Sequence, residues 1–173
     1  GSSDPYNPVV IDGLKLTYTT SYVDTYSLEG PTATYYFSGF IGAVYGKATI
    51  ENIKFQNVTI QTPASDMKLL NPKANNNTCG IIGGVVATPE NPEFDVTIKN
   101  VVVENTCSVV GNSRVGGIVG FIGGYTAAQS RDVVVNGETI QSAYIPAENS
   151  KVTLEGCKFA GTVKSTFDKS PYA

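Results

Sequence analysis

The sequence of 173 residues contains no histidine, no tryptophan and a single methionine. Without histidine, the chain cannot build the Ser-His or Cys-His nucleophile that many hydrolases use. Its glycine-rich segments also lack the Gly-Lys-Ser/Thr ending of a phosphate-binding P-loop and the spacing of a dinucleotide fingerprint. We therefore expect no catalytic residues and no cofactor.

Charge and long hydrophobic runs are scarce as well. Charged residues make up 16% of the chain, the net charge is −3, and the Lys and Arg residues are scattered. This pattern gives no basic footprint for nucleic acid. Apolar runs such as 115–124 are too short and too rich in glycine to span a bilayer, which takes about 20 helical residues. The sequence predicts neither a nucleic-acid partner nor a membrane span.

What the sequence does contain is a glycine-rich segment that occurs three times, at residues 39–46, 80–87 and 117–124. In each copy, alternate positions carry a large apolar residue, glycine, a large apolar residue and a small residue. These positions are Phe40/Gly42/Val44/Gly46, Ile81/Gly83/Val85/Ala87 and Ile118/Gly120/Ile122/Gly124. A period of two predicts a strand, and glycine at an inward position predicts a close approach of backbones.

A second segment follows each copy, at residues 49–57, 97–105 and 153–161, and a further version lies at 10–18. Its fourth position always carries a residue type that readily accepts a positive φ, which predicts a sharp corner. These residues are Asn52, Asn100, Gly156 and Gly13. Inward positions are expected after this corner, at Phe55, Val103, Phe159 and Leu16. A second corner is expected at Asn57, Asn105 and Gly161.

Repeats with unequal spacing indicate a fixed scaffold with variable loops, which favours an all-β fold of the parallel β-helix type. We predict a single β-solenoid domain over residues 1–173. It would have an extended lead at 1–8, an N-terminal coil and cap at 9–37, three repeat units at 38–163 and a tail at 164–173. Equivalent positions such as 42, 83 and 120 should then lie in neighbouring layers.

Tyrosines cluster near the N-terminus, with Tyr18, Tyr22 and Tyr26 four residues apart. They are expected to cover the open end of the stack, because the end of a solenoid must be hidden from water. The alternative is a platform for sugar rings, since tyrosine offers an apolar face and a polar tip.

The cysteines, Cys79, Cys107 and Cys157, are odd in number and lack the spacing of a metal site. Cys157 occupies the inward position that Ile53 and Val101 fill elsewhere, which predicts a small buried apolar residue. A bridge between the other two cysteines stays open.

Three carboxylates lie close together at Glu90, Glu93 and Asp95. They could hold a hard cation such as calcium, but they lack the spaced Asp/Asn/Gly pattern of a calcium loop. We expect a solvated acidic turn and no metal site.

The third repeat carries the longest insertion, residues 125–152, and an Asn-Gly pair at 136–137 predicts a β-hairpin near residues 132–141. If the repeats stack in register, all insertions leave from one side, where repeat proteins usually bind their ligands. The residues expected to contact a ligand there are Tyr125, Arg131, Asp132 and Tyr144. The alternative is that the hairpin only shields an edge.

A glycoside hydrolase needs two carboxylates facing each other across about 5–10 Å. The acids of this chain lie mostly on turns or at outward positions such as Glu51, Glu104 and Glu155. We therefore expect a protein that is not an enzyme. A carbohydrate-active enzyme on a β-helix, with Arg131 and Asp132 in its site, and a purely structural spacer in a larger surface protein remain alternatives.

Residues 115–120, with looser versions at 38–42 and 79–83, resemble the GLUG motif of bacterial secreted and surface proteins, including adhesins and lipoproteins of gut anaerobes. The resemblance implies a right-handed β-helix-like fold, export to the cell surface or the extracellular space, and adhesion or glycan contact. A glycan or a surface protein would be the ligand. The family has no established catalytic residues. The chain begins with Gly1 instead of methionine, which predicts a trimmed chain whose signal segment lies outside this sequence.

Overall fold

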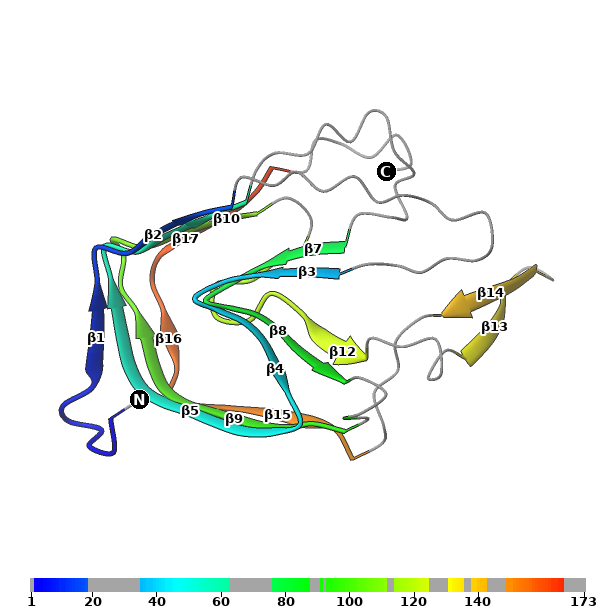
Figure 1. Ribbon diagram of the computed structural model, residues 1–173, viewed down its shortest axis with the longest axis horizontal. Coiled ribbons are helices and arrows are strands. Elements are labelled where there is room, and N and C mark those ends of the chain that lie inside the picture. Colours follow the sequence, from blue (N-terminus) through cyan, green and yellow to red (C-terminus); the bar gives the residue numbers. More distant parts are fainter. Residues whose placement is uncertain are drawn as a thin grey trace.

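The computed structural model describes residues 2–18, 35–62, 76–87, 91, 93–111, 114–124, 131–135, 138–142 and 149–166. In these ranges the chain is all-β, formed by strands, turns and bends without a helix, and most strands pair in parallel (Figure 1). None of the described residues forms a helix that is long and apolar enough to cross a membrane. The expectation of an all-β fold with parallel sheets is therefore confirmed.

Four parallel sheets bring together strands from distant parts of the described sequence. The first contains, in order, β1 (Val9–Asp12), β5 (Lys47–Gln56), β9 (Asp95–Val103) and β15 (Lys151–Glu155), with β16 (Lys158–Phe159) also paired to β9. The second contains β2 (Lys15–Thr17), β6 (Thr59–Gln61), β10 (Ser108–Gly111) and β17 (Thr162–Ser165). The third contains β3 (Tyr35–Ser38), β7 (Asn76–Cys79) and β11 (Arg114–Val115). The fourth contains β4 (Ile41–Tyr45), β8 (Ile82–Ala87) and β12 (Ile122–Gly124).

Each sheet pairs one strand from each repeat, so the repeats form layers. We call residues 35–62, 76–111 and 114–166 the first, second and third layers, and residues 9–18 a partial layer beside the first. The glycine-rich segments stack as expected, because Ile41 pairs with Ile82 and Ile82 pairs with Val119. A Cβ added at Gly83 would lie 2.5 Å from the carbonyl oxygen of Gly42 in the next layer. Glycine at this position therefore permits the close stacking of the layers.

The predicted corners have the expected backbone geometry. The φ angles are 54° at Asn52, 50° at Asn100, 61° at Gly156 and 69° at Gly13, all in the left-handed region that asparagine and glycine tolerate best. At the second corner, Asn57 has a φ of 52°, whereas Asn105 and Gly161 are not in this conformation. The chain passes from the first sheet to the second at this place in all three layers, so the second corner is confirmed, but only the first layer has a positive φ there.

The register of the N-terminal segment differs from the prediction. Gly13 was expected beside Asn52, but Asp12 pairs with Gln56 and Lys15 pairs with Thr59, which places Gly13 beside Asn57. Leu16 accordingly lies opposite Ile60 and not opposite Phe55. Both corners of the first layer have a positive φ, so the residue type at position 13 suits either one, and strand pairing decides between them.

The core lies between the sheets and is built from columns of equivalent apolar residues. Their second-layer members are fully buried, with Val85, Ile98 and Val109 each 0% exposed. Burying one such side chain contributes about 1.5–3 kcal/mol. Cys157 faces this core as predicted, is half-buried, and donates a hydrogen bond of 3.3 Å from its Sγ to the carbonyl oxygen of Ile98. All three cysteines are free, so Cys79 and Cys107 form no bridge.

The predicted hairpin is present as β13 (Arg131–Val135) and β14 (Glu138–Ser142), which pair antiparallel. Val135 pairs with Glu138, and the Asn-Gly pair between them lies outside the described residues. The hairpin pairs with no other strand in the described part of the chain, and Figure 1 shows it beyond the tips of β8 and β12.

Candidate functional site

The two longer insertions leave the stack at a single corner, between the fourth sheet and the first. The strand ends before the corner are in register, since Tyr45 pairs with Val86 and Val86 pairs with Gly123. The strand starts after the corner are in register too, since Lys47 and Lys151 both pair with Asp95. We call this place the insertion corner and define it as residues 45–47, 86–95 and 123–151.

Hydrogen bonds fix the bases of both insertions at this corner. The amide of Asp95 donates to the carbonyl oxygen of Gly46 over 3.0 Å, and the amide of Lys151 donates to that of Phe94 over 2.8 Å. The amide of Phe94 also donates to Oγ of Ser150 over 3.3 Å. Each layer therefore anchors the insertion of the layer beside it, which gives the variable loops a common rigid support.

Gly46 connects the two sheets in the first layer, where the sequence makes the shortest passage around the corner. Its φ of 62° is in the left-handed region, and a Cβ there would lie 3.3 Å from Oδ1 of Asn91 in the neighbouring insertion. A side chain at this position would thus strain the backbone and crowd Asn91. Glycine at this position therefore leaves room for Asn91 beside the first layer.

The structure describes the predicted contact residues only in part. Arg131 and Asp132 begin β13, where they pair with Ser142 and Gln141. Consecutive strand positions belong to opposite faces, so these two positions do not share one face of the hairpin. Tyr125 and Tyr144 lie outside the described residues.

The sequence-based prediction missed Tyr45, an aromatic residue at the insertion corner. Its side chain is 47% exposed at the end of β4, and its partner in the second layer is Val86. The signal was visible in the glycine-rich segments, because the outward position before the corner carries tyrosine in one copy and smaller residues in the other two.

A second group that the sequence did not predict lies between the third and fourth sheets, whose strands diverge from a shared turn in Figure 1. The ring centroids of Phe37 and Phe121 are 6.2 Å apart, and the guanidinium of Arg114 lies 5.2 Å from the centroid of Phe121. Phe37 fits there because the second layer has Gly84, where a Cβ would come within 2.5 Å of the ring. A contact of this kind between arginine and an aromatic ring contributes about 0.5–1 kcal/mol at an exposed site.

Two carboxylates at the insertion corner, those of Glu93 and Asp95, have partners. Oε1 of Glu93 accepts a hydrogen bond of 3.5 Å from the side-chain amide of Asn149, and Oδ2 of Asp95 lies 3.5 Å from Nζ of Lys151. The third acid of the predicted cluster, Glu90, lies outside the described residues. Among the residues that the structure describes, no three metal-ligating side chains come together.

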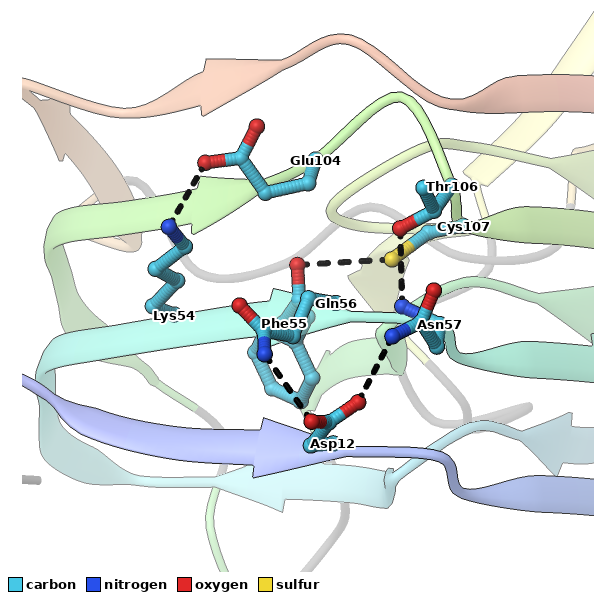
Figure 2. Close-up of polar contacts among 8 residues, drawn as sticks. All are labelled: Asp12, Lys54, Phe55, Gln56, Asn57, Glu104, Thr106 and Cys107. Atoms are coloured by element: carbon cyan, nitrogen blue, oxygen red, sulfur yellow. Dashed lines mark hydrogen bonds and ion pairs between the residues drawn. The ribbon is translucent and has the colours of Figure 1, made fainter.

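At the other end of β5, a polar network connects the partial, first and second layers (Figure 2). The Asp12 carboxylate accepts hydrogen bonds of 2.9 Å from Nε2 of Gln56 and from Nδ2 of Asn57. These hydrogen bonds, that of Gln56 first, lower the pKa of Asp12. The lowered pKa keeps this carboxyl group charged, which suits its role as the acceptor of both side-chain amides.

The same network continues into the second layer (Figure 2). The backbone amide of Asn57 donates to Oγ1 of Thr106 over 2.8 Å. Beside it, Nζ of Lys54 lies 3.0 Å from Oε1 of Glu104. These hydrogen bonds and the ion pair each join side chains or backbone groups of neighbouring layers. This arrangement is typical of a structural corner.

Tyr18 contacts the edge of the first layer. Its hydroxyl donates to the carbonyl oxygen of Gly39 over 2.8 Å and accepts from the amide of Gly39 over 3.2 Å. The equivalent amide in the second layer, that of Gly80, donates instead to the carbonyl oxygen of Ser38 in the layer before it. The Tyr18 hydroxyl thus accepts from Gly39 as a backbone carbonyl of the neighbouring layer accepts from Gly80, which favours the covering role for Tyr18. Tyr22 and Tyr26 lie outside the described residues.

Comparison with known proteins adds no family or function: no protein-family model, curated protein or solved structure matches this chain.

Proposed function

We propose that the chain is a non-enzymatic module of the bacterial cell surface or the extracellular space, which binds a glycan or a surface protein. Its scaffold would be a right-handed β-solenoid, the handedness being implied by the resemblance of residues 115–120 to the GLUG motif. The ligand would contact the insertion corner.

The support for a solenoid is the continuous register of its layers. Every parallel sheet pairs a strand of the second layer with the equivalent strands of the first and third layers. A chain that winds around a common axis would return to the same position after each repeat, as these strand pairs do. The glycine column, in which Gly42, Gly83 and Gly120 lie beside one another, supports the same interpretation.

The single observation that carries the binding proposal is the shared exit of the insertions. Because Lys47, Asp95 and Lys151 are in register, segments of very different length span the same gap in the scaffold. A rigid frame that tolerates such variation at one corner is how repeat proteins present binding loops. The exposed ring of Tyr45 beside the loops adds an apolar surface with a polar tip, which suits a sugar ring.

The register also suggests the test. Residues 88–94 and 125–150 span the same gap in neighbouring layers, so the shorter segment can replace the longer one without altering the strands. We expect the wild-type protein to bind members of a panel of immobilised glycans and bacterial or host surface proteins. The grafted variant should lose at least 10-fold in affinity while keeping the wild-type circular dichroism.

Two further variants locate the contact within the corner. The double substitution Tyr125→Ala and Tyr144→Ala should weaken binding through loss of predicted contacts, and Tyr45→Ala should weaken it independently. Tyr6→Ala is the matched control, because Tyr6 is 95% exposed and lies in the N-terminal lead. A wild-type chain that binds no probe would favour the structural spacer. Unaltered binding by the grafted variant would exclude the insertion corner as the contact surface.

A further inference from the structure

The outer face of the first sheet carries a regular array of side chains. In the register of this sheet, each row has a charged residue, a threonine and a residue of the opposite charge. The rows are Lys47/Thr49/Glu51 on β5, Asp95/Thr97/Lys99 on β9 and Lys151/Thr153/Glu155 on β15. Opposite charges therefore alternate down each column. The two ion pairs between β9 and β15 measure 3.5 Å for Asp95–Lys151 and 3.2 Å for Lys99–Glu155.

The last row of this array lies on β15, which is an edge strand of the first sheet among the described residues. The backbone amide of Lys151 donates to the carbonyl oxygen of Phe94, the residue before β9, so the backbone groups of Lys151 face the second layer. Backbone groups alternate in direction along a strand, and those of Val152 and Leu154 must therefore point away from β9. Two amide and two carbonyl groups of β15 are thus directed toward the open edge.

The same edge also exposes apolar surface. In the third layer Leu154 is 50% exposed, Ile122 is 49% exposed and Val163 is 43% exposed. Their partners in the second layer, which are Ile98, Val85 and Val109, are all 0% exposed. Positions that are buried in the second layer are therefore exposed to solvent in the third. A partner that covered this end of the stack would bury them and enlarge the core.

From this edge we infer that the chain forms a symmetric dimer, in which β15 of one copy pairs antiparallel with β15 of a second copy around Thr153. The sequence of β15 complements itself in this arrangement. Lys151 lies opposite Glu155 of the second copy, Val152 opposite Leu154, and Thr153 opposite Thr153. The Val152–Leu154 pairs form the backbone hydrogen bonds, because their amide and carbonyl groups point outward. The charged pairs occupy the non-hydrogen-bonded positions, where side chains approach most closely.

The charge pattern distinguishes this dimer from other ways of covering the edge. A parallel, in-register approach of β5 from a second copy would place Lys47 opposite Lys151 and Glu51 opposite Glu155. Like charges directly opposite each other destabilise a strand pair. Lysine on an edge strand discourages indiscriminate pairing, and here only the antiparallel partner neutralises it. The alternation of charges therefore favours an antiparallel partner, and the exposed Leu154 favours β15 as the strand that pairs.

The interface is short, since β15 contributes five residues and the apolar contacts come from the partly covered end of the core. Interfaces at the low end of the usual size range are weak or transient. We expect a dissociation constant of about 1–100 µM, which corresponds to a dimer that forms on a crowded surface and dissociates on dilution.

Charge exchange on the full chain tests the inference by sedimentation velocity and light scattering. The wild-type protein should change from monomer to dimer as its concentration rises through the micromolar range. Lys151→Glu and Glu155→Lys each create like-charged pairs across the dimer, and each should raise the dissociation constant roughly 10-fold or more. An equimolar mixture of the two variants restores opposite charges and should form a heterodimer with close to wild-type affinity.

Lys47→Glu is the matched control, because Lys47 pairs in register with the same second-layer residue, Asp95, from the other side of β9. This variant should dimerise like the wild type. Urea unfolding of each variant separates a loss of folding from a loss of pairing. A wild-type chain that stays monomeric up to millimolar concentration overturns the inference. So does a mixture that forms no heterodimer, or a Lys47→Glu variant that weakens the dimer as much as Lys151→Glu.

Discussion

The side-chain amide of Asn100 donates a hydrogen bond of 3.0 Å to Oδ1 of Asn52 in the neighbouring layer. Nδ2 of Asn52 in turn donates to the carbonyl oxygen of Ser2 over 2.6 Å. Both asparagines have a positive φ, so one residue type provides the backbone conformation of the corner and the contact between the layers. In the third layer, Gly156 keeps the positive φ but has no side chain to make the contact. A side chain would not fit there, because its Cβ would lie 2.5 Å from Oδ1 of Asn100.

The first prediction separates these two roles at Asn100. Asn100→Gly keeps the permitted φ and loses the side-chain hydrogen bond, so it should lower the free energy of unfolding by about 1 kcal/mol. Asn100→Ala also places an unfavourable residue in the left-handed region, which adds about 1–2 kcal/mol. Urea unfolding measures both values. Asn105→Ala is the control at an exposed asparagine without a positive φ, and it should change stability by less than about 0.5 kcal/mol. Equal effects of alanine and glycine at position 100 would contradict the backbone argument.

The second prediction compares two glycines of the same column. A Cβ at Gly83 would lie 2.5 Å from the carbonyl oxygen of Gly42 and 2.8 Å from the amide nitrogen of Ser38, and neither backbone group can move aside easily. At Gly42 the nearest atom would be 3.4 Å away, which is an ordinary contact. We expect Gly83→Ala to destabilise by about 3 kcal/mol or more and Gly42→Ala by less than about 1 kcal/mol.

Thermal unfolding of the two variants measures this difference. The substitution is the same at both positions, and both lie in equivalent strands, so the difference in strand propensity between glycine and alanine cancels. The remaining difference in stability reports the space between the layers. Similar melting temperatures for Gly83→Ala and Gly42→Ala would mean that the layers are not as closely stacked as the register requires.

These corners and columns could be predicted because they depend on local sequence. Alternation with a period of two, and asparagine or glycine at a corner, are properties that a single segment reveals by itself. Asn52, Asn100 and Gly156 were found in this way, as was the inward position of Cys157. The pairing of β13 with β14 was predictable for the same reason, from the local sequence of the hairpin.

What the sequence did not reveal depends on contacts between layers. Gly13 satisfies the conformation of either corner, and only the pairing of Asp12 with Gln56 decides between them. The position of Phe37 depends on an absent side chain at Gly84, in a different layer and a different sheet. Tyr45 was not predicted because the alternation of a strand identifies its inward positions. It does not indicate which outward residue lies beside a loop.

The third prediction concerns the hydroxyl of Tyr18. Tyr18→Phe keeps the ring but removes both hydrogen bonds to Gly39, so it should lower the free energy of unfolding by about 1–2 kcal/mol. The exchange of the Gly39 amide hydrogen should accelerate more than that of amides in β9, since the loss is local to the edge. Tyr6→Phe is the control, because its side chain is 95% exposed. Unaltered exchange at Gly39 would exclude Tyr18 as the group that covers this edge.

The fourth prediction follows from the lowered pKa of Asp12. Hydrogen bonds from Gln56 and Asn57 stabilise the charged carboxylate in the folded chain, whereas the unfolded chain titrates near the ordinary value of about 3.9. A folded pKa below the unfolded one gives a contribution to stability that is complete above the unfolded pKa. That contribution is lost as the pH falls through the folded pKa. In Asp12→Asn it is absent at every pH.

Urea unfolding between pH 2 and pH 7 measures this dependence. The stability difference between wild type and Asp12→Asn should be constant near neutral pH and should shrink as the pH falls below about 4. Asp4→Asn is the matched control in the N-terminal lead, where the carboxylate accepts the backbone amide of Tyr6 over 2.9 Å. An Asp12 difference that grows at low pH would reverse the sign of the linkage. The corner would then be stabilised by the neutral carboxyl group, and the two amide donors drawn to Asp12 could not be its principal contacts.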